Sequence, residues 1–114
     1  MSLFTEQLNN WDDWGKVFHS IPAFKSLVEY IFNKESLLIA EIENLKPGTN
    51  AVFKVGEYVI KIFAPQGLDD GFGTNVDVEL FGMKLANVRG VPAPKLIADG
   101  VVEDKYDFRY ILTV

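Results

Sequence analysis

The run from Tyr58 to Phe63, YVIKIF, places one lysine, Lys61, in the middle of an otherwise apolar segment. Aromatic and β-branched residues favour strands, and side chains in a strand alternate between its two faces. Val59, Lys61 and Phe63 therefore share one face. Because an unpaired charge among apolar side chains costs several kcal/mol, either that face is solvated or the ammonium group has a dedicated partner.

The composition is that of one small globular domain. The chain has 114 residues, of which 48% are hydrophobic and 13% aromatic, enough for a single core. No apolar stretch approaches the roughly 20 residues of a membrane-spanning helix, and the first residues lack the basic start and apolar block of a signal peptide. We therefore expect no membrane association.

Charge and cysteine content narrow the possible partners and location. Eleven basic residues stand against 16 acidic ones, a net charge of −5, so we expect no nucleic-acid partner. The absence of cysteine excludes disulfides and thiolate metal sites and fits a reducing, cytoplasmic location.

The first 36 residues have helical periodicity and are predicted to form an N-terminal helical segment. In its first part, helical spacing relates Leu8, Trp11, Gly15 and Phe18. Pro22 interrupts this pattern and suits the first turn of a second helix. The apolar stripe of that helix consists of Phe24, Leu27, Val28 and Ile31.

Residues 37–63 are predicted to form three strands. LLIAEIENL (37–45) alternates apolar and acidic residues, and KPGTN (46–50) has the composition of a turn. AVFKV (51–55) and YVIKIF (58–63) are joined tightly at Gly56-Glu57. Sequential strands with short turns make an antiparallel meander.

A helix and two further strands follow. After a glycine-rich loop (64–76), residues 77–90 have helical periodicity, with Asn75 or Asp77 able to cap the start and Gly90 able to end it. We expect the buried stripe of this helix to consist of Val78, Phe81, Leu85 and Val88. The segments 95–104 and 106–114 are two more strands around a turn near Asp104-Lys105.

The expected fold is thus α+β: a five-stranded antiparallel sheet with one inserted helix, preceded by two N-terminal helices. We expect residues 1–36 and 37–114 to form one compact domain overall.

The inserted helix offers Lys61 a carboxylate partner. Glu79 lies in its first turn, in line with Met83 and Ala86 and bordering the apolar stripe. A Lys61–Glu79 ion pair would neutralise the ammonium. In the alternative, Lys61 lies on a solvated sheet face and Glu79 merely favours the helix N-terminus. Spacing alone favours this alternative.

The order of these elements resembles the small lobe of a kinase, in which a strand lysine contacts the ATP phosphates and a helix acid holds it. The chain is especially similar to the N-terminal lobe of the aminoglycoside phosphotransferase and choline kinase-like family. The similar segments are KPGTNAVFKVGEYVIKIFAP, VELFGMKLANVRGVPAPKLIADG and YDFRYILTV, which span roughly the last two thirds of the chain.

The resemblance implies a role for individual residues. Lys61 corresponds to the lysine that contacts the α- and β-phosphates, and Glu79 to its partner. The loop that covers the nucleotide phosphates corresponds to Gly48, Thr49 and Asn50. The residues that cover the adenine ring correspond to Val59 and Val52. The strand that leads into the hinge between the lobes corresponds to Ile111, Leu112 and Thr113, and the hinge itself to Val114. The implied ligands are ATP with Mg²⁺, and a small-molecule hydroxyl compound as substrate.

Two departures from kinases limit what this stretch is expected to do. Its phosphate loop has a single glycine in place of GxGxxG, which favours the aminoglycoside-type branch. The His-x-Asp catalytic loop, its Asn and the metal-binding aspartate are absent, since the only histidine, His19, precedes Ser20 and Ile21. We therefore expect no catalytic residue and no metal ligand here, and a lobe that is inactive alone and self-associates through its inter-lobe face.

A second interpretation remains open. The chain would then be a non-catalytic α+β interaction or regulatory domain with Lys61 exposed. Replacing Lys61 with alanine distinguishes the two, because it would abolish phosphoryl transfer by the complete kinase and do little in an interaction domain.

Overall fold

A computed structural model describes residues 3–45, 50–65, 76–91 and 94–114. In chain order its elements are α1 (Trp11–Val17), α2 (Ile21–Lys34), β1 (Ile42–Asn44), β2 (Ala51–Val55), β3 (Tyr58–Ile62), α3 (Val76–Arg89), β4 (Leu96–Glu103) and β5 (Asp107–Thr113). The strands form one antiparallel sheet in the order β1-β2-β3-β5-β4. The expected α+β fold is confirmed.

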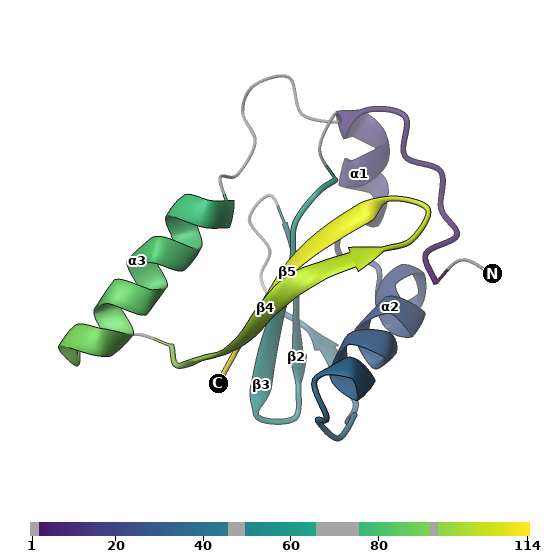
Figure 1. Cartoon of the computed structure of the whole chain (residues 1–114). Helices are drawn as coiled ribbons and strands as arrows, with labels where there is room; N and C mark the ends of the chain where they lie inside the picture. Colours follow the sequence, from purple (N-terminus) through teal and green to yellow (C-terminus); the bar gives the residue numbers. More distant parts are fainter. Residues whose placement is uncertain (1–2, 46–49, 66–75, 92–93) are drawn as a thin grey trace.

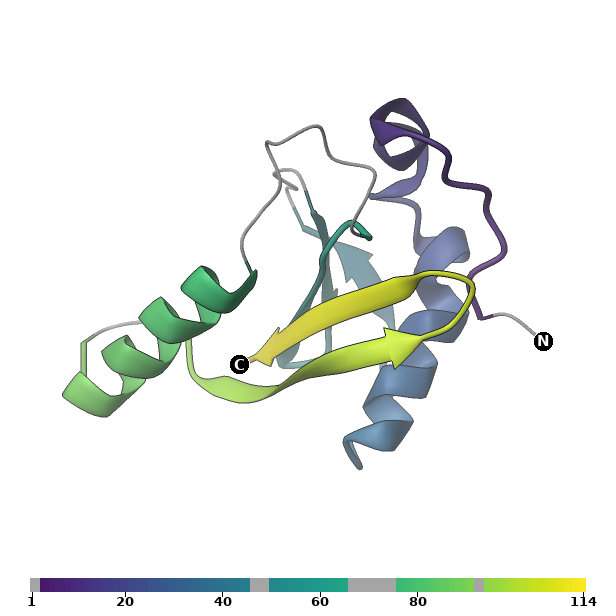
Figure 2. The ribbon, with the colours of Figure 1, turned by 45° about the horizontal axis from the view of Figure 1, so that its top comes forward.

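The helices lie on opposite faces of the sheet. α1 and α2 cover one face, and α3 lies alone across the other (Figure 1 and Figure 2). Strand β3 shows the alternation that separates the faces: Ile60 and Ile62 are fully buried towards α2, whereas Lys61 on the other face is half-buried.

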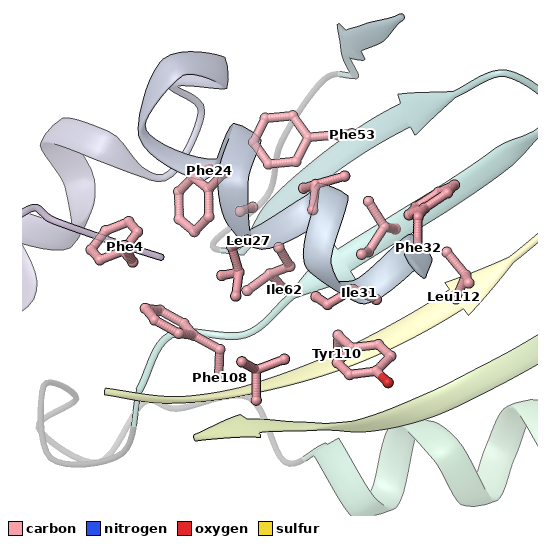
Figure 3. Close-up of a cluster of buried hydrophobic side chains, with 14 of the residues drawn as sticks. Phe4, Phe24, Leu27, Ile31, Phe32, Phe53, Ile62, Phe108, Tyr110 and Leu112 are labelled. Atoms are coloured by element: carbon pink, nitrogen blue, oxygen red, sulfur yellow. The ribbon is translucent and has the colours of Figure 1, made fainter. Parts of the chain in front are cut away.

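The main core lies between α2 and the sheet and is rich in aromatic side chains (Figure 3). Phe24 is central to it, with ring centroids 5.0 Å from Phe4 and 5.6 Å from Phe53. This core includes side chains from the N-terminal helices and from four strands of the sheet, so the helical segment and the sheet share one hydrophobic core.

Local capping explains where the N-terminal helices begin. Asn10 accepts a hydrogen bond from the N–H of Asp13 and caps α1, and Ser20 caps α2 with Pro22 in the first turn. The expected stripe of α2 is buried. The expectation that Leu8 belongs to the first helix is wrong. Leu8 lies before the Asn10 cap, in the non-helical segment that precedes α1, and is buried there.

Strand β1 is shorter than its alternation suggests. Only Ile42–Asn44 pair with β2, and Leu38 is 92% exposed. The tight turn at Gly56 is confirmed, with a φ of 63°, a conformation that glycine adopts without steric cost.

The prediction for the buried stripe of α3 is wrong. Val78, Phe81, Leu85 and Val88 are exposed, and the helix instead packs Val76, Leu80 and Met83 against the sheet. The helix therefore carries two apolar rows. Glu79 lies beside the sheet only when the row of Val76, Leu80 and Met83 packs against the sheet. Asp77 lies inside the helix and is not its cap, whereas Asn75 lies outside the described residues.

The end of α3 agrees with the sequence. Gly90 has a φ of 71°, and the N–H groups of Gly90 and Val91 donate to the carbonyls of Asn87 and Ala86. This is the double hydrogen bond of a Schellman motif.

Asp104 ties the N-terminal segment to the β4–β5 turn. Its carboxylate accepts hydrogen bonds from the N–H groups of Leu3 (3.0 Å) and Phe4 (3.1 Å). Burial alone would raise the pKa of this carboxyl, but backbone hydrogen bonds from Leu3, Phe4 and Lys105 outweigh it, so the pKa of Asp104 lies below its ordinary value.

We predict that Asp104→Asn lowers the free energy of unfolding at pH 7. The folded state favours the charged carboxylate, so its contribution is present above the ordinary aspartate pKa of about 3.9 and is lost as the pH falls through the lowered folded value. Urea unfolding of the wild-type and Asp104→Asn proteins should therefore show a difference in the free energy of unfolding that is larger at pH 7 than near pH 3. Exposed Asp107 provides the control, and an equal effect of Asp107→Asn would contradict the assignment.

Gly100 leaves room for the buried ring of Tyr110 on the neighbouring strand. A Cβ at position 100 would lie 2.8 Å from the Tyr110 hydroxyl and 3.0 Å from its Cζ. That hydroxyl donates to Glu35 at the end of α2, so the ring is held in place. Burial, reinforced by Glu35, raises the pKa of Tyr110 above its ordinary value of 10.0.

We predict that Gly100→Ala destabilises the fold by roughly 1–3 kcal/mol, the usual cost of overpacking a core. Gly82→Ala is the matched control: nothing lies within 4 Å of the added Cβ in α3, so this change should stabilise by about 0.5–1 kcal/mol. Urea unfolding curves measure both, and a neutral Gly100→Ala would show that the ring moves freely.

Candidate functional site

Lys61 lies in the centre of the sheet on the face opposite the main core. The register of β3 places it across from Val52 on β2 and Ile111 on β5. Its ammonium also lies 5.3 Å from the ring centroid of Phe63, a favourable cation–π distance. The strand thus presents a cation on a largely apolar surface.

Glu79 supplies the counter-charge. Lys61 Nζ donates to Glu79 Oε1 at 2.7 Å, and the two side chains are each 30% exposed. The predicted ion pair is therefore confirmed. With about a third of each side chain still exposed, the ammonium keeps a route to solvent from which an anionic ligand can approach.

A small apolar cluster positions the carboxylate. Leu80, the residue after Glu79, packs with Phe63 and Ile111, and Val76, Met83 and Leu96 surround these three. Because Leu80 is buried, the adjacent Glu79 lies beside the sheet, where Lys61 can reach it.

Two further ion pairs join α3 to the sheet. Arg109 on β5 contacts Asp77 at 3.2 Å, and Lys84 contacts Asp99 on β4 at 4.0 Å. Sequence reasoning missed both pairs. Alternation along β5 places Arg109 on the face of Ile111, but only the β3–β5 pairing shows that this is also the face of Lys61.

The predicted adenine-contacting residues lie around Lys61. Val52 is its cross-strand neighbour, and Val59 is paired with Thr113 of β5. Both valines are half-buried and Thr113 is 7% exposed. The structure therefore brings Val52, Val59 and Thr113 to the face of the sheet that carries the ion pair.

The other predicted residues are placed differently. Asn50 is 4% exposed, and its side-chain oxygen accepts a hydrogen bond from the N–H of Ala64 at 3.4 Å, a structural contact between two chain segments. The N–H of Val114 donates to the carbonyl of Lys95, so it is engaged within the chain. Gly48 and Thr49 lie outside the described residues.

A separate surface hollow lies at the β2–β3 turn. It has a volume of about 460 Å³ and is lined by Ser36, Leu37, Leu38, Ala40, Val55, Gly56, Glu57 and Tyr58. None of these belongs to the Lys61–Glu79 site, and the hollow presents no cation, so we assign it no role in that site.

Chemically, the site is a lysine ammonium held by a carboxylate on a partly apolar surface. Within the described residues, no group of three or more His, Cys, Asp or Glu side chains is arranged to hold a metal ion. A lysine ammonium is a compact charge suited to phosphate, and its carboxylate partner holds it in an extended conformation.

Comparisons with protein-family models, with characterised proteins and with solved structures found no match to the chain. Among the described residues, no helix is long and apolar enough to cross a bilayer.

We predict that Lys61 and Glu79 are energetically coupled by about 1 kcal/mol, as expected for a close and partly buried ion pair. A double-mutant cycle of Lys61→Met and Glu79→Gln, followed by urea unfolding, measures this coupling. The same cycle on the longer and more exposed Lys84–Asp99 pair is the internal control. Equal coupling in the two cycles would show that Glu79 does not hold Lys61 specifically.

Proposed function

We propose that this chain is the ATP-binding small lobe of a small-molecule phosphotransferase, resembling the aminoglycoside phosphotransferase and choline kinase-like family. The observation that carries the proposal is the 2.7 Å contact between Lys61 on β3 and Glu79 on the following helix. In protein kinases a lysine and a glutamate on the corresponding elements form such a pair, and the lysine binds the ATP phosphates.

The surroundings of the pair support the same ligand. Val52 and Val59 lie on the face of Lys61 and offer apolar contact for an adenine ring, while the ammonium would bind the α- and β-phosphates. The complete reaction would move the γ-phosphoryl group of ATP to a substrate hydroxyl. Its magnesium ligands and catalytic carboxylate would come from a large lobe, because the 114 residues contain no His-x-Asp motif and their single histidine, His19, is followed by Ser20 and Ile21.

The alternative, a non-catalytic interaction domain, is favoured by a different observation. The outward side of α3 exposes apolar side chains, among them Phe81 at 68% and Val88 at 84%. This surface does not conflict with nucleotide binding, because Glu79 lies on another side of the helix. The two functions are therefore separable by experiment.

We predict weak ATP binding, with a dissociation constant of about 1 mM or higher, because the second wall of a nucleotide cleft would be missing. Titration of the ¹⁵N-labelled chain with Mg-ATP should shift the amide resonances of Val52, Val59, Lys61 and Thr113. Lys61→Ala should weaken ATP binding about tenfold or more, the loss of one charge-assisted phosphate contact.

Two controls make the titration decisive. Lys25→Ala removes the same charge from the exposed side of α2, on the opposite face of the sheet, and should leave ATP binding unchanged. Adenosine lacks phosphates, so Lys61→Ala should hardly alter its binding. Shifts that do not cluster around Lys61, or equal effects of the two alanine variants, would favour the interaction domain.

A further inference from the structure

Helix α3 carries an unburied row of large apolar side chains. Val78, Phe81, Leu85 and Val88 are 65%, 68%, 38% and 84% exposed. Their spacing of three, four and three residues is that of a coiled-coil seam. A helix with an apolar row on both sides is normally covered on both sides, yet only one of the two apolar rows of α3 packs against the sheet.

The position of α3 leaves this row open. The helix lies at the margin of the molecule, on the opposite side of the sheet from α1 and α2, and no other described element lies beyond it (Figure 1 and Figure 2). Val91, just after the helix, is 52% exposed and adds to the apolar character of this margin.

We propose that this outer row of α3 is a self-association surface that pairs with α3 of a second copy of the chain in antiparallel orientation. The row is self-complementary about Met83. Reversing the helix about this point exchanges Val78 with Val88 and Phe81 with Leu85. An antiparallel pair therefore forms four apolar layers, and each layer joins side chains from both copies.

The charges along the helix favour the same orientation. Asp77 lies in the first turn and Arg89 in the last, and both are exposed. Antiparallel pairing brings the acidic first turn of one copy alongside the basic last turn of the other and opposes the two helix dipoles. Parallel pairing would place like charges together. Gly82, beside the row and with open space around it, lets the helices approach closely.

The size of the surface predicts a weak dimer. Fourteen helical residues span about 21 Å, and one helix pair buries less than the roughly 1,200–2,000 Å² of a stable complex. We expect a monomer–dimer equilibrium with a dissociation constant between roughly 10 µM and 1 mM. This equilibrium is independent of nucleotide binding, since Lys61 and Glu79 do not belong to the surface.

Sedimentation velocity over that concentration range tests the surface. Phe81→Ala with Val88→Ala should weaken dimerisation at least about tenfold, while folding is retained because both residues are exposed and alanine favours helix. Leu38→Ala, at a residue that is 92% exposed elsewhere, is the matched control and should leave the equilibrium unchanged. Circular dichroism verifies that each variant is folded.

The orientation is tested separately. Arg89→Glu should weaken an antiparallel dimer because it replaces a base with an acid at the end where the acidic first turn of the other copy lies. The chain has no cysteine, so single cysteines report proximity. Val78→Cys mixed with Val88→Cys should give the mixed disulfide on oxidation. Val78→Cys alone should not cross-link, because two such positions would lie about 15 Å apart along the axis.

Three results would overturn the proposal. The first is a wild-type chain that stays monomeric at 1 mM, roughly the weakest affinity considered. The second is a dimer whose dissociation constant does not change in the Phe81→Ala, Val88→Ala variant. The third is efficient cross-linking of Val78→Cys with itself. A monomeric wild type would mean that another part of the protein or another partner covers α3.

Discussion

The positive charge of Lys61 constrains the arrangement of everything on its side of the sheet. Strand β3 presents apolar side chains on both faces, so the ammonium group needs a carboxylate nearby. Glu79 meets that need only when α3 is rotated to direct Leu80 into the small cluster with Phe63 and Ile111. The same rotation turns the second apolar row of α3 outward. The candidate ligand site and the exposed surface therefore both follow from this one rotation of α3.

The two faces of the sheet divide structural and chemical roles. Towards α1 and α2, the sheet is closed by tightly packed aromatic and aliphatic side chains, including Phe24, Phe53 and Phe108. Towards α3, a cluster of three buried residues is accompanied by three ion pairs. Most of the hydrophobic stabilisation consequently comes from the first face. The second face carries its charged pairs beside a smaller apolar cluster.

Much of the fold was predictable because it follows from local rules. Alternation in β3 indicated which side chains share a face of the sheet, and Pro22 indicated the start of α2. Glycines that have positive φ in the structure, Gly56 and Gly90, indicated the β2–β3 turn and the end of α3. The rotation of α3 was not predictable from periodicity, since Val78 and Leu80 belong to two competing apolar rows. The contacts that choose between these rows are long-range, and so is the pairing that brings Arg109 to Asp77. Likewise, Leu8 is buried in the main core although it lies outside the helix that its spacing suggested.

The link between the N-terminal segment and Asp104 has a consequence for biosynthesis. Leu3 and Asp104 are 101 positions apart, so a segment that leaves the ribosome early docks against one that leaves it much later. Phe4 packs 5.0 Å from Phe108, which reinforces this delay. Aromatic side chains of the early helices therefore stay partly uncovered until the β4–β5 hairpin emerges. Protection of the nascent chain from aggregation is therefore most needed in the interval between synthesis of the N-terminal helices and emergence of this hairpin.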